Sequence, residues 1–261
     1  MIKSQQDIRD TVAAMLAAEL SCSPADLTDG RVHITVRDPN AHENPAHRLF
    51  PPHPGRIGIA SLGTGGIVCV DGPHLAWAEE VFGAMTTRDE IFMPQPVGRM
   101  ADIIKPAGLT LFGPFPRFAV SRNSLVHIEP PGGYVVKVVD QAGADSIKER
   151  DKWVYSIALD PAATARPTVI AAIAEHKGEV VGVCGASADS PYMWQLGIDV
   201  TPDHQGRGIA PALTSAVAKA VLEAGKLPYY GATNSNVPSM RTALAAGFKP
   251  TWVEVLSRPS S

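Results

Sequence analysis

The stretch GIDVTPDHQGRGIAPALTSAV, residues 197–217, decides how this chain folds. It begins within the apolar run 193–200, whose length and composition predict a strand. It then passes through the glycine-containing loop 205–210 into a stripe of apolar residues at helical spacing, which predicts a helix from about residue 208 to residue 224. A strand, a short loop and a helix in this order indicate an α/β fold.

The loop between this strand and this helix has the chemistry of an anion site. Three or four backbone N–H groups at a helix N-terminus have no partner within the helix, and the helix dipole adds positive potential there. Gly206 and Gly208 let a ligand approach the backbone, and Arg207 can add a charge-assisted contact. Several adjacent donors suit a pyrophosphate. The loop matches neither GxxxxGK[ST] nor GxGxxG, and a glycine-rich turn without a ligand is the alternative.

A second stretch, NVPSMRTALAAGF at 236–248, follows a short predicted strand at 227–232. Together the two stretches resemble the GCN5-related N-acetyltransferase (GNAT) superfamily. The acyl-CoA motif of that family is [QR]-x-x-G-x-[GA] after a strand that ends in Val, and its closing signature begins with Asn and ends with Gly-Phe. The resemblance covers roughly residues 133–256. The residues that satisfy the first motif are Gln205, Gly208 and Ala210, and Asn236 begins the second.

The resemblance implies an α/β fold in two domains. A GNAT domain over 133–258 is expected to be a mixed, mostly antiparallel sheet flanked by helices, with strands 4 and 5 splayed apart. Residues 1–125 are expected to form an N-terminal α/β domain without a cofactor motif, which in two-domain relatives is often a degenerate copy of the same fold. Zwittermicin-resistance-type acetyltransferases and glycine N-acyltransferase-like proteins share this layout. We expect the N-terminal domain to cover the acceptor side and to help set substrate choice.

The resemblance also implies an activity, an acetyl-CoA-dependent N-acetyltransferase acting on the primary amine of a small molecule. The amine attacks the thioester directly, and the enzyme contributes proximity, polarisation of the carbonyl and proton management. The residues that the resemblance assigns to the cofactor, acetyl-CoA (coenzyme A), are Ile198, Asp199, Val200, Gln205, Gly206, Arg207, Gly208, Ile209, Ala210 and Asn236.

Two positions depart from the family's usual proton-transfer residues. Ala243 stands where many members have a Tyr as general acid for the departing thiolate, and Trp194 stands where many have a Glu as general base. Tyr229 and Tyr230, on the strand predicted at 227–232, are possible substitutes for the acid, although tyrosines on strands often only pack.

The remaining roles have candidates of differing strength. Asp199 is the nearest carboxylate on the strand and Asp189 is a weaker candidate, while a water-mediated base, a base elsewhere or none at all stay open. A structural hydrogen-bonding role is the alternative for Asp199. Trp194 and Gln195 are expected to shape the acceptor pocket. The catalytic candidates are therefore Asp199, Asn236 and Tyr230.

Bulk composition argues against several function classes. The chain has 261 residues, of which 45% are hydrophobic, and a formal net charge of −3, so it can bury a core and has no long basic block for nucleic acid or an anionic membrane. Its three cysteines are far apart and show no metal-binding spacing. No apolar run reaches the length of a membrane span or a signal peptide. We expect a cytoplasmic protein without a metal, for which a homodimer is a possible assembly.

Two other functions stay open at this stage. Ala243 and Trp194 also suit an acyl-CoA-binding or regulatory module with weak catalysis. The same site with a different acyl pocket would suit an acyltransferase that uses a longer acyl-CoA.

Periodicity and turn residues predict the remaining elements. Helices are expected at 6–20, 75–85, 144–158 and 236–246, with a further helix start at 23–26, and strands at 57–60, 67–70, 134–139, 169–175, 180–187 and 248–256.

Overall fold

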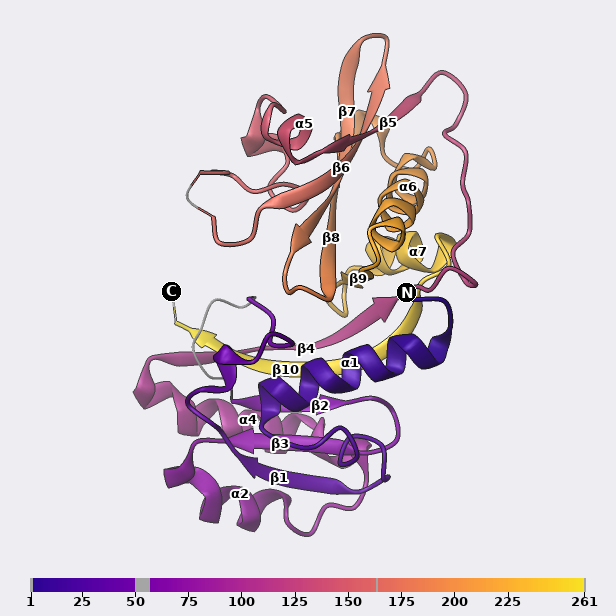
Figure 1. The fold of residues 1–261 in the computed structure, drawn as a ribbon. Coiled ribbons are helices and arrows are strands. Elements are labelled where there is room, and N and C mark those ends of the chain that lie inside the picture. The colour runs from indigo at the N-terminus through magenta and orange to yellow at the C-terminus, as the bar shows by residue number, and fades with distance from the viewer. Residues whose placement is uncertain (1, 50–56, 163, 261) are drawn as a thin grey trace. The chain divides into compact units, whose positions relative to one another are not determined.

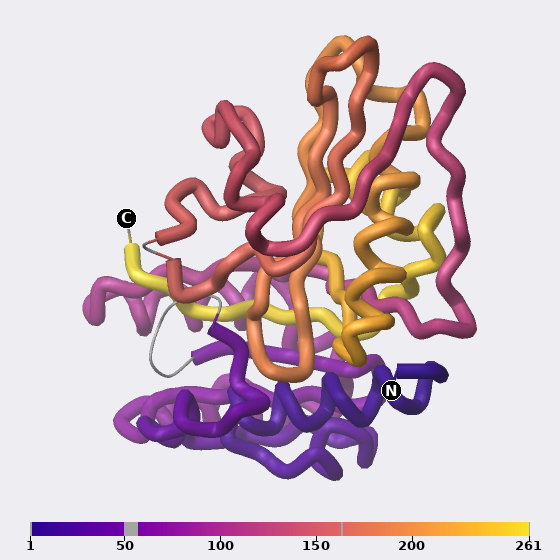
Figure 2. Tube along the Cα trace, turned by 45° about the horizontal axis from the view of Figure 1, so that its top comes forward, coloured from indigo at the N-terminus to yellow at the C-terminus, as the bar shows by residue number. Residues whose placement is uncertain are grey.

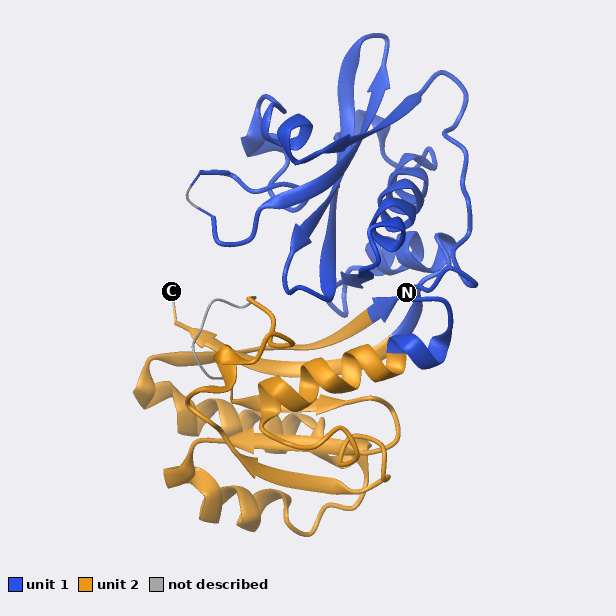
Figure 3. Ribbon diagram, in the orientation of Figure 1, with its two compact units in different colours: residues 1–8, 118–250 blue, residues 9–117, 251–261 orange. Residues whose placement is uncertain are grey.

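The computed structural model divides into two compact units, which are coloured separately in Figure 3. Unit 1 comprises Met1–Ile8 and Phe118–Pro250, and unit 2 comprises Arg9–Arg117 and Thr251–Ser261. The residues that the structure describes are 2–49, 57–162 and 164–260.

Each unit is formed by two separate segments of the chain. Residues 251–261 belong to unit 2 together with most of the N-terminal half. The predicted domains, 1–125 and 133–258, stay a prediction from the sequence. In the structure, the compact unit that contains the loop 205–210 ends at Pro250.

The strands of unit 1 form a mixed sheet. They are β5 (Val135–Asp140), β6 (Thr168–His176), β7 (Glu179–Ala188), β8 (Met193–Val200) and β9 (Leu227–Gly231). Their order is β9-β8-β7-β6-β5 (Figure 1). Neighbours are antiparallel from β5 to β8, whereas β8 and β9 run parallel. This confirms the mixed, mostly antiparallel sheet that the sequence predicts.

Helices flank this sheet. Helix α6 (Ile209–Glu223) packs against β6, β7, β8 and β9, and helix α7 (Val237–Ala245) packs against α6. A short helix, α5 (Gln141–Asp145), packs against β5 and β6. The segment that leads into β5 runs past α6 (Figures 1 and 2), where the Ser215 hydroxyl donates a hydrogen bond of 2.7 Å to the carbonyl oxygen of Val126.

The turn between β6 and β7 explains why these strands form a hairpin. Lys177 and Gly178 both have positive φ, 52° and 86°. Two consecutive residues of this kind form a tight turn whose twist matches that of the flanking strands. The predicted hairpin of 169–175 and 180–187 is therefore confirmed.

Unit 2 is a second α/β unit. Its strands are β1 (Val32–Val36), β2 (Gly58–Ser61), β3 (Gly66–Val70), β4 (Leu109–Ala119) and β10 (Lys249–Pro259), in the order β1-β3-β2-β10-β4. Its helices are α1 (Gln5–Leu20), α2 (Leu75–Phe82), α3 (Arg88–Ile91) and α4 (Pro94–Ile104). Apolar side chains from the strands and from α2, α3 and α4 form one core, which includes Val68, Phe82 and Met100. The boundary between the units falls within α1, β4 and β10.

Short 3-10 helices occur in both units. They are Ala41–Glu43, Gly72–His74, Lys105–Ala107, Arg150–Lys152 and Pro202–His204.

The helix predicted over 144–158 is wrong. Only α5 and one 3-10 turn are helical there, and Glu149 between them has a left-handed φ of 52°. The N–H groups of Tyr155 and Ser156 donate to the Asp199 carboxylate, whereas in a continuous helix they would donate to carbonyl oxygens four residues earlier. The Arg150 guanidinium donates to the carbonyl oxygens of Ala158 and Ala144, which replaces part of the hydrogen bonding of a helix.

Two further expectations in the first half need correction. Ser23 and Asp26 exchange backbone and side-chain hydrogen bonds as at a helix start, but the chain continues as a turn that ends near Gly30, whose φ is 85°. The strands β1 and β4 and the helices α3 and α4 were not predicted. In α4, Pro94 and Pro96 occupy the first turn, where proline is tolerated because the N–H groups there have no helical partner.

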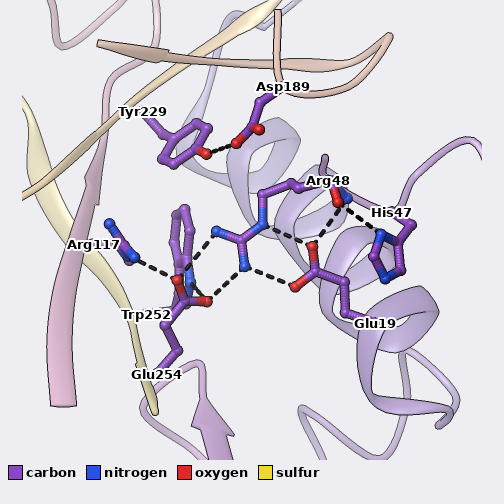
Figure 4. Close-up of polar contacts among 8 residues, drawn as sticks. All are labelled: Glu19, His47, Arg48, Arg117, Asp189, Tyr229, Trp252 and Glu254. Carbon is purple, nitrogen blue, oxygen red and sulfur yellow. Dashed lines mark hydrogen bonds and ion pairs between the residues drawn. The ribbon is translucent and has the colours of Figure 1, made fainter. Parts of the chain in front are cut away.

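A buried charge cluster joins three elements of unit 2 (Figure 4). The Arg48 guanidinium lies 2.7 Å from a carboxylate oxygen of Glu19 on α1 and 2.7 Å from one of Glu254 on β10. Glu254 also accepts hydrogen bonds from Arg117 on β4, at 2.7 Å, and from the Trp252 indole, at 2.9 Å. All four charged side chains are at least nine-tenths buried, so each depends on its partners for the solvation it has lost.

Replacing Glu254 by Gln should destabilise the protein. Burial by itself raises the pKa of Glu254, but attraction from Arg48 and Arg117 outweighs it, so the pKa lies below its usual value of 4.5. Removing one partner of a buried ion pair costs about 3 to 5 kcal/mol. We expect a loss of this size in urea unfolding at pH 7.

The pH dependence gives a second readout for the same variant. A carboxyl whose pKa is depressed by folding contributes stability above its unfolded pKa and loses it as pH falls through the folded pKa. Below pH 4.5, the wild type should therefore lose stability more steeply than E254Q. The control is Glu175→Gln, which breaks an exposed pair with Lys137 and should cost at most about 1 kcal/mol. Equal costs for the two variants would contradict the account.

Candidate active site

Strands β8 and β9 begin side by side and then separate. Their register runs from Met193 opposite Leu227 to Leu196 opposite Tyr230, whereas β8 continues to Val200. On its other edge β8 stays paired with β7 over the same stretch. Residues 197–200 therefore present backbone N–H and C=O groups on the edge from which β9 has separated. The pairing ends here as the predicted splay of strands 4 and 5 requires, and β9 itself ends one residue after its last paired residue, at Gly231.

The two faces of β8 have different neighbours because successive side chains of a strand point to opposite faces. A Cβ added to Gly182, the β7 partner of Val200, would lie 3.1 Å from Leu213 of α6, so this face is covered by the helix. A Cβ added to Gly197 would lie 1.7 Å from the carbonyl oxygen of Tyr155, so the other face is covered by the segment that contains Tyr155. The β8 residues on the α6 face are Leu196, Ile198 and Val200, and those on the other face are Gln195, Gly197 and Asp199.

The loop predicted to hold a pyrophosphate leads directly from the open edge into α6. Gly206 and Gly208 have positive φ, 72° and 84°, and a Cβ on either would meet no atom within 4 Å. Gly208 is the N-cap of α6 and makes no side-chain cap, so the first N–H groups of the helix point into the loop. Gln205 donates a hydrogen bond of 2.9 Å to the carbonyl oxygen of Val200, which ties the loop to the end of β8.

Tyr230 lies where the two strands separate, on the α6 face of the sheet. Its hydroxyl is 2.8 Å from the Ser239 hydroxyl on α7, and its ring contacts Phe248 edge-on. The side chain is 2% exposed, and burial raises the pKa of Tyr230 to about 12. At neutral pH the phenol is therefore protonated and can donate a proton but cannot accept one as a phenolate.

Asn236 and Ala243 both lie on or next to α7. Asn236 is the N-cap of α7, and its side-chain oxygen accepts a hydrogen bond of 3.1 Å from the N–H of Ser239. Ala243, which replaces the usual tyrosine, is fully buried. Ser239 thus connects Asn236 to Tyr230, and two of the three predicted catalytic residues meet at this serine.

Asp199 has its partners on the other face. Its Oδ2 accepts hydrogen bonds from the backbone N–H groups of Tyr155 and Ser156, at 3.0 and 2.9 Å, and from the Ser156 hydroxyl, at 2.8 Å. It is thus not in hydrogen-bond contact with the serine that links Asn236 and Tyr230.

The two predicted acceptor-pocket residues point in opposite directions. Trp194 and Gln195 are consecutive on β8, so their side chains lie on opposite faces. Lys226 places its ammonium 6.0 Å from the centre of the Trp194 ring. The Gln195 side-chain oxygen accepts a hydrogen bond of 2.8 Å from Arg166.

A polar network surrounds Gln195 on its face of the sheet. The Arg166 guanidinium, which also donates to Gln195, lies 2.7 Å from a carboxylate oxygen of Asp189. Figure 4 shows the contact at the other oxygen of Asp189, which accepts a hydrogen bond from the Tyr229 hydroxyl. Asp189 and Tyr229 are fully buried, while the Arg166 side chain is 21% exposed. Gln195 and Tyr229 face each other one register position before Leu196 and Tyr230, which are the last pair of β8 and β9.

Sequence reasoning missed Arg166 and Ser239. Arg166 precedes β6 in a loop of ordinary polar composition, and no local pattern marks it as the partner of Asp189. Ser239 could have been noticed, because the closing signature of the resembled family allows Ser three residues after its Asn. Cys184 is fully buried on β7, and this burial raises the pKa of its thiol.

The comparison with known families agrees with this geometry. Residues 134–248 match the model of the Acetyltransferase (GNAT) family. The match begins just before β5 and ends at Phe248, so it contains the open edge, the loop and α7. This chain therefore carries a domain of the GNAT family of acetyltransferases. No curated protein matches the chain.

Several solved structures are similar to part of the chain. One is a GCN5-related N-acetyltransferase from Kribbella flavida, with 19% identity and a TM-score of 0.45 over 62% of this chain and 64% of that one. Another is a GCN5-related N-acetyltransferase-like protein from Streptococcus suis, with 18% identity and a TM-score of 0.40 over 59% and 66%. A third is yncA from Salmonella typhimurium with its cofactor acetyl-CoA, with 16% identity and a TM-score of 0.36 over 50% and 95%. The chain thus matches just under two thirds of the length of the first two.

In residues 2–49, 57–162 and 164–260, no helix has both the length and the apolar character that crossing a membrane requires. In the same ranges, no group of three or more His, Cys, Asp or Glu residues is arranged to hold a metal ion.

The hydroxyl of Tyr229 should contribute measurably to stability. Tyr229→Phe removes a donor from the fully buried carboxylate of Asp189, and leaving a buried acceptor short of a donor costs about 1 to 3 kcal/mol. Tyr192→Phe is the control, because that side chain is 50% exposed and its loss of the hydroxyl should change stability by less than about 0.5 kcal/mol. Urea unfolding of both variants makes the comparison, and an unchanged midpoint for Y229F would contradict the role of this hydrogen bond.

Proposed function

We propose that this protein is an acetyl-CoA-dependent N-acetyltransferase that acts on the primary amine of a small molecule. The observation that carries the proposal is the open edge of β8 at 197–200, which leads without interruption into the loop 205–210 at the N-terminus of α6. An extended chain with a phosphate group at one end fits this succession of strand edge and helix N-terminus.

The residues at the loop fit the pyrophosphate of coenzyme A. The positive φ values and open surroundings of Gly206 and Gly208 leave room for a ligand against the backbone, and Arg207 is exposed beside them. The backbone N–H groups of Gly208, Ile209 and Ala210 would bind the phosphates, with the helix dipole adding positive potential. The backbone of Ile198, Asp199 and Val200 would hold the acetyl-pantetheine arm.

The chemistry needs a proton donor for the departing sulfur. Acetyl-CoA supplies an acetyl thioester, so that a C–N bond to the amine forms, the C–S bond breaks and the sulfur gains a proton. Tyr230 supports this last role, because its phenol is protonated at neutral pH and lies at the point where the strands separate. Asn236 acts through Ser239, since it fixes the N–H of the serine whose hydroxyl contacts Tyr230.

The alternatives from the sequence make different predictions about turnover. A binding or regulatory module would bind the cofactor without releasing thiol in the presence of any amine. An acyltransferase for longer chains would prefer propionyl-CoA or benzoyl-CoA to acetyl-CoA. The cytoplasmic location, the homodimer and the role of residues 1–125 stay predictions from the sequence.

Acetyl-CoA should raise the thermal stability of the protein. A ligand present at 100 times its dissociation constant stabilises the folded state by about 2.7 kcal/mol. We therefore expect a clear rise in Tm at millimolar acetyl-CoA, with propionyl-CoA and benzoyl-CoA measured in parallel. No rise with any of the three would contradict the proposed cofactor, and a larger rise with benzoyl-CoA would favour the longer acyl chain.

Tyr230→Phe should lower kcat while leaving acetyl-CoA bound. Removing a general acid typically costs about 10²- to 10⁴-fold in rate, and the phenyl ring keeps the packing against Phe248. The measurement is thiol release with a panel of primary amines, together with acetyl-CoA affinity by calorimetry. Tyr192→Phe, an exposed tyrosine, is the matched control and should retain full activity. A kcat within threefold of the wild type for Y230F would rule out this donor.

A further inference from the structure

The segment Trp153–Ile157 is anchored at both ends. Trp153 and Ile157 are 2% and 4% exposed and pack in a core cluster with Val183 of β7. Between them, Val154 and Tyr155 are exposed. The segment therefore crosses the sheet as a bridge whose middle presents side chains to solvent and whose backbone faces the strands.

The middle of this segment touches the sheet through its backbone. A Cβ on Gly185 of β7 would lie 1.9 Å from the carbonyl oxygen of Ser156, and one on Gly197 of β8 would lie 1.7 Å from that of Tyr155. Gly185 and Gly197 are directly opposite each other in the sheet. Because neither glycine has a side chain, the backbone of Tyr155 and Ser156 can lie directly against the two strands. A Cβ at either position would collide with that backbone.

One carboxylate oxygen holds the segment in this position. Asp199 Oδ2 accepts from the N–H groups of Tyr155 and Ser156 and from the Ser156 hydroxyl, and these residues are 43 and 44 positions away in the sequence. All three donors are neutral, so the contact is a set of charge-assisted hydrogen bonds rather than an ion pair.

The contact between Asp199 and this segment lies on the acceptor side of the proposed site. Helix α6 covers the face of β8 that carries Ile198 and Val200, so the acceptor side of the proposed site is the face that carries Asp199. The segment Trp153–Ile157 lies on that face, over Gly197, which is the first residue of the open edge.

We propose that Asp199 is a positioning residue, which holds the segment Trp153–Ile157 as a fixed wall of the acceptor side of the site. This proposal rests on the proposed acetyl transfer, because that reaction is what makes this side of β8 an acceptor site. Asp199 acts through the backbone of Tyr155 and Ser156, and it shapes acceptor binding rather than taking a proton from the amine.

Backbone hydrogen exchange tests the contact without any knowledge of the acceptor. Asp199→Ala removes all three hydrogen bonds, and net contributions near 1 kcal/mol each imply exchange at the Tyr155 and Ser156 amides at least about tenfold faster. Asp199→Asn retains an oxygen acceptor but loses the negative charge, so its exchange should lie between that of the wild type and that of D199A. Ser156→Ala, which removes one bond, keeps the test valid if D199A does not fold, and should also lie between the wild type and D199A. Asp89→Ala, an exposed carboxylate of unit 2, should change nothing. Unchanged exchange in both D199A and S156A would overturn the proposal.

Steady-state kinetics separate a positioning residue from a base. With an amine that the panel shows to be acetylated, D199A should raise the acceptor KM at least about tenfold, with kcat and acetyl-CoA affinity within threefold, and D199N should restore KM. If D199N and D199A instead lower kcat equally, Asp199 is the base and the proposal is wrong. If no amine releases thiol, the proposed function fails, while the exchange experiment still decides whether Asp199 holds the segment.

Discussion

The separation of β9 from β8 after the pair Leu196–Tyr230 is the constraint on which the site depends. Backbone N–H and C=O groups need hydrogen-bond partners, and a strand that loses its neighbour in the middle of a sheet leaves a row of them available. β8 keeps its shape there because β7 holds its other edge as far as Val200. The loop 205–210 and α6 follow at once, so the open edge ends at a helix N-terminus.

The two faces of the sheet carry different groups of polar residues. On the α6 face, the buried Tyr230 hydroxyl lies 2.8 Å from the partly buried hydroxyl of Ser239. On the opposite face, Asp199 fixes a crossing segment and Arg166 lies beside Gln195 and the buried Asp189. The alternation of side chains along the strands thus places Tyr230 and the segment held by Asp199 on opposite faces of the sheet.

The place of the loop 205–210 between a strand and a helix was predictable from the sequence because its signals are local. Two glycines, an arginine and a helix start lie within six residues, and the strands around them have clear apolar patterns. The partners of Asp199 were not predictable, since they lie more than 40 positions away in a stretch whose composition predicts a helix. No local sequence pattern indicates that residues 251–261 belong to unit 2, because β10 has the composition of an ordinary apolar strand. Contacts between distant segments decide these features.

In the proposed function, the open edge of β8 and the loop 205–210 bind the acyl-CoA. Hydrogen exchange of the wild-type protein with and without acetyl-CoA measures this most directly, amide by amide. We predict slower exchange at residues 197–200 and at 206–210 when acetyl-CoA is bound, with little change in unit 2. Protection confined to other segments, or none at saturating acetyl-CoA, would contradict the account.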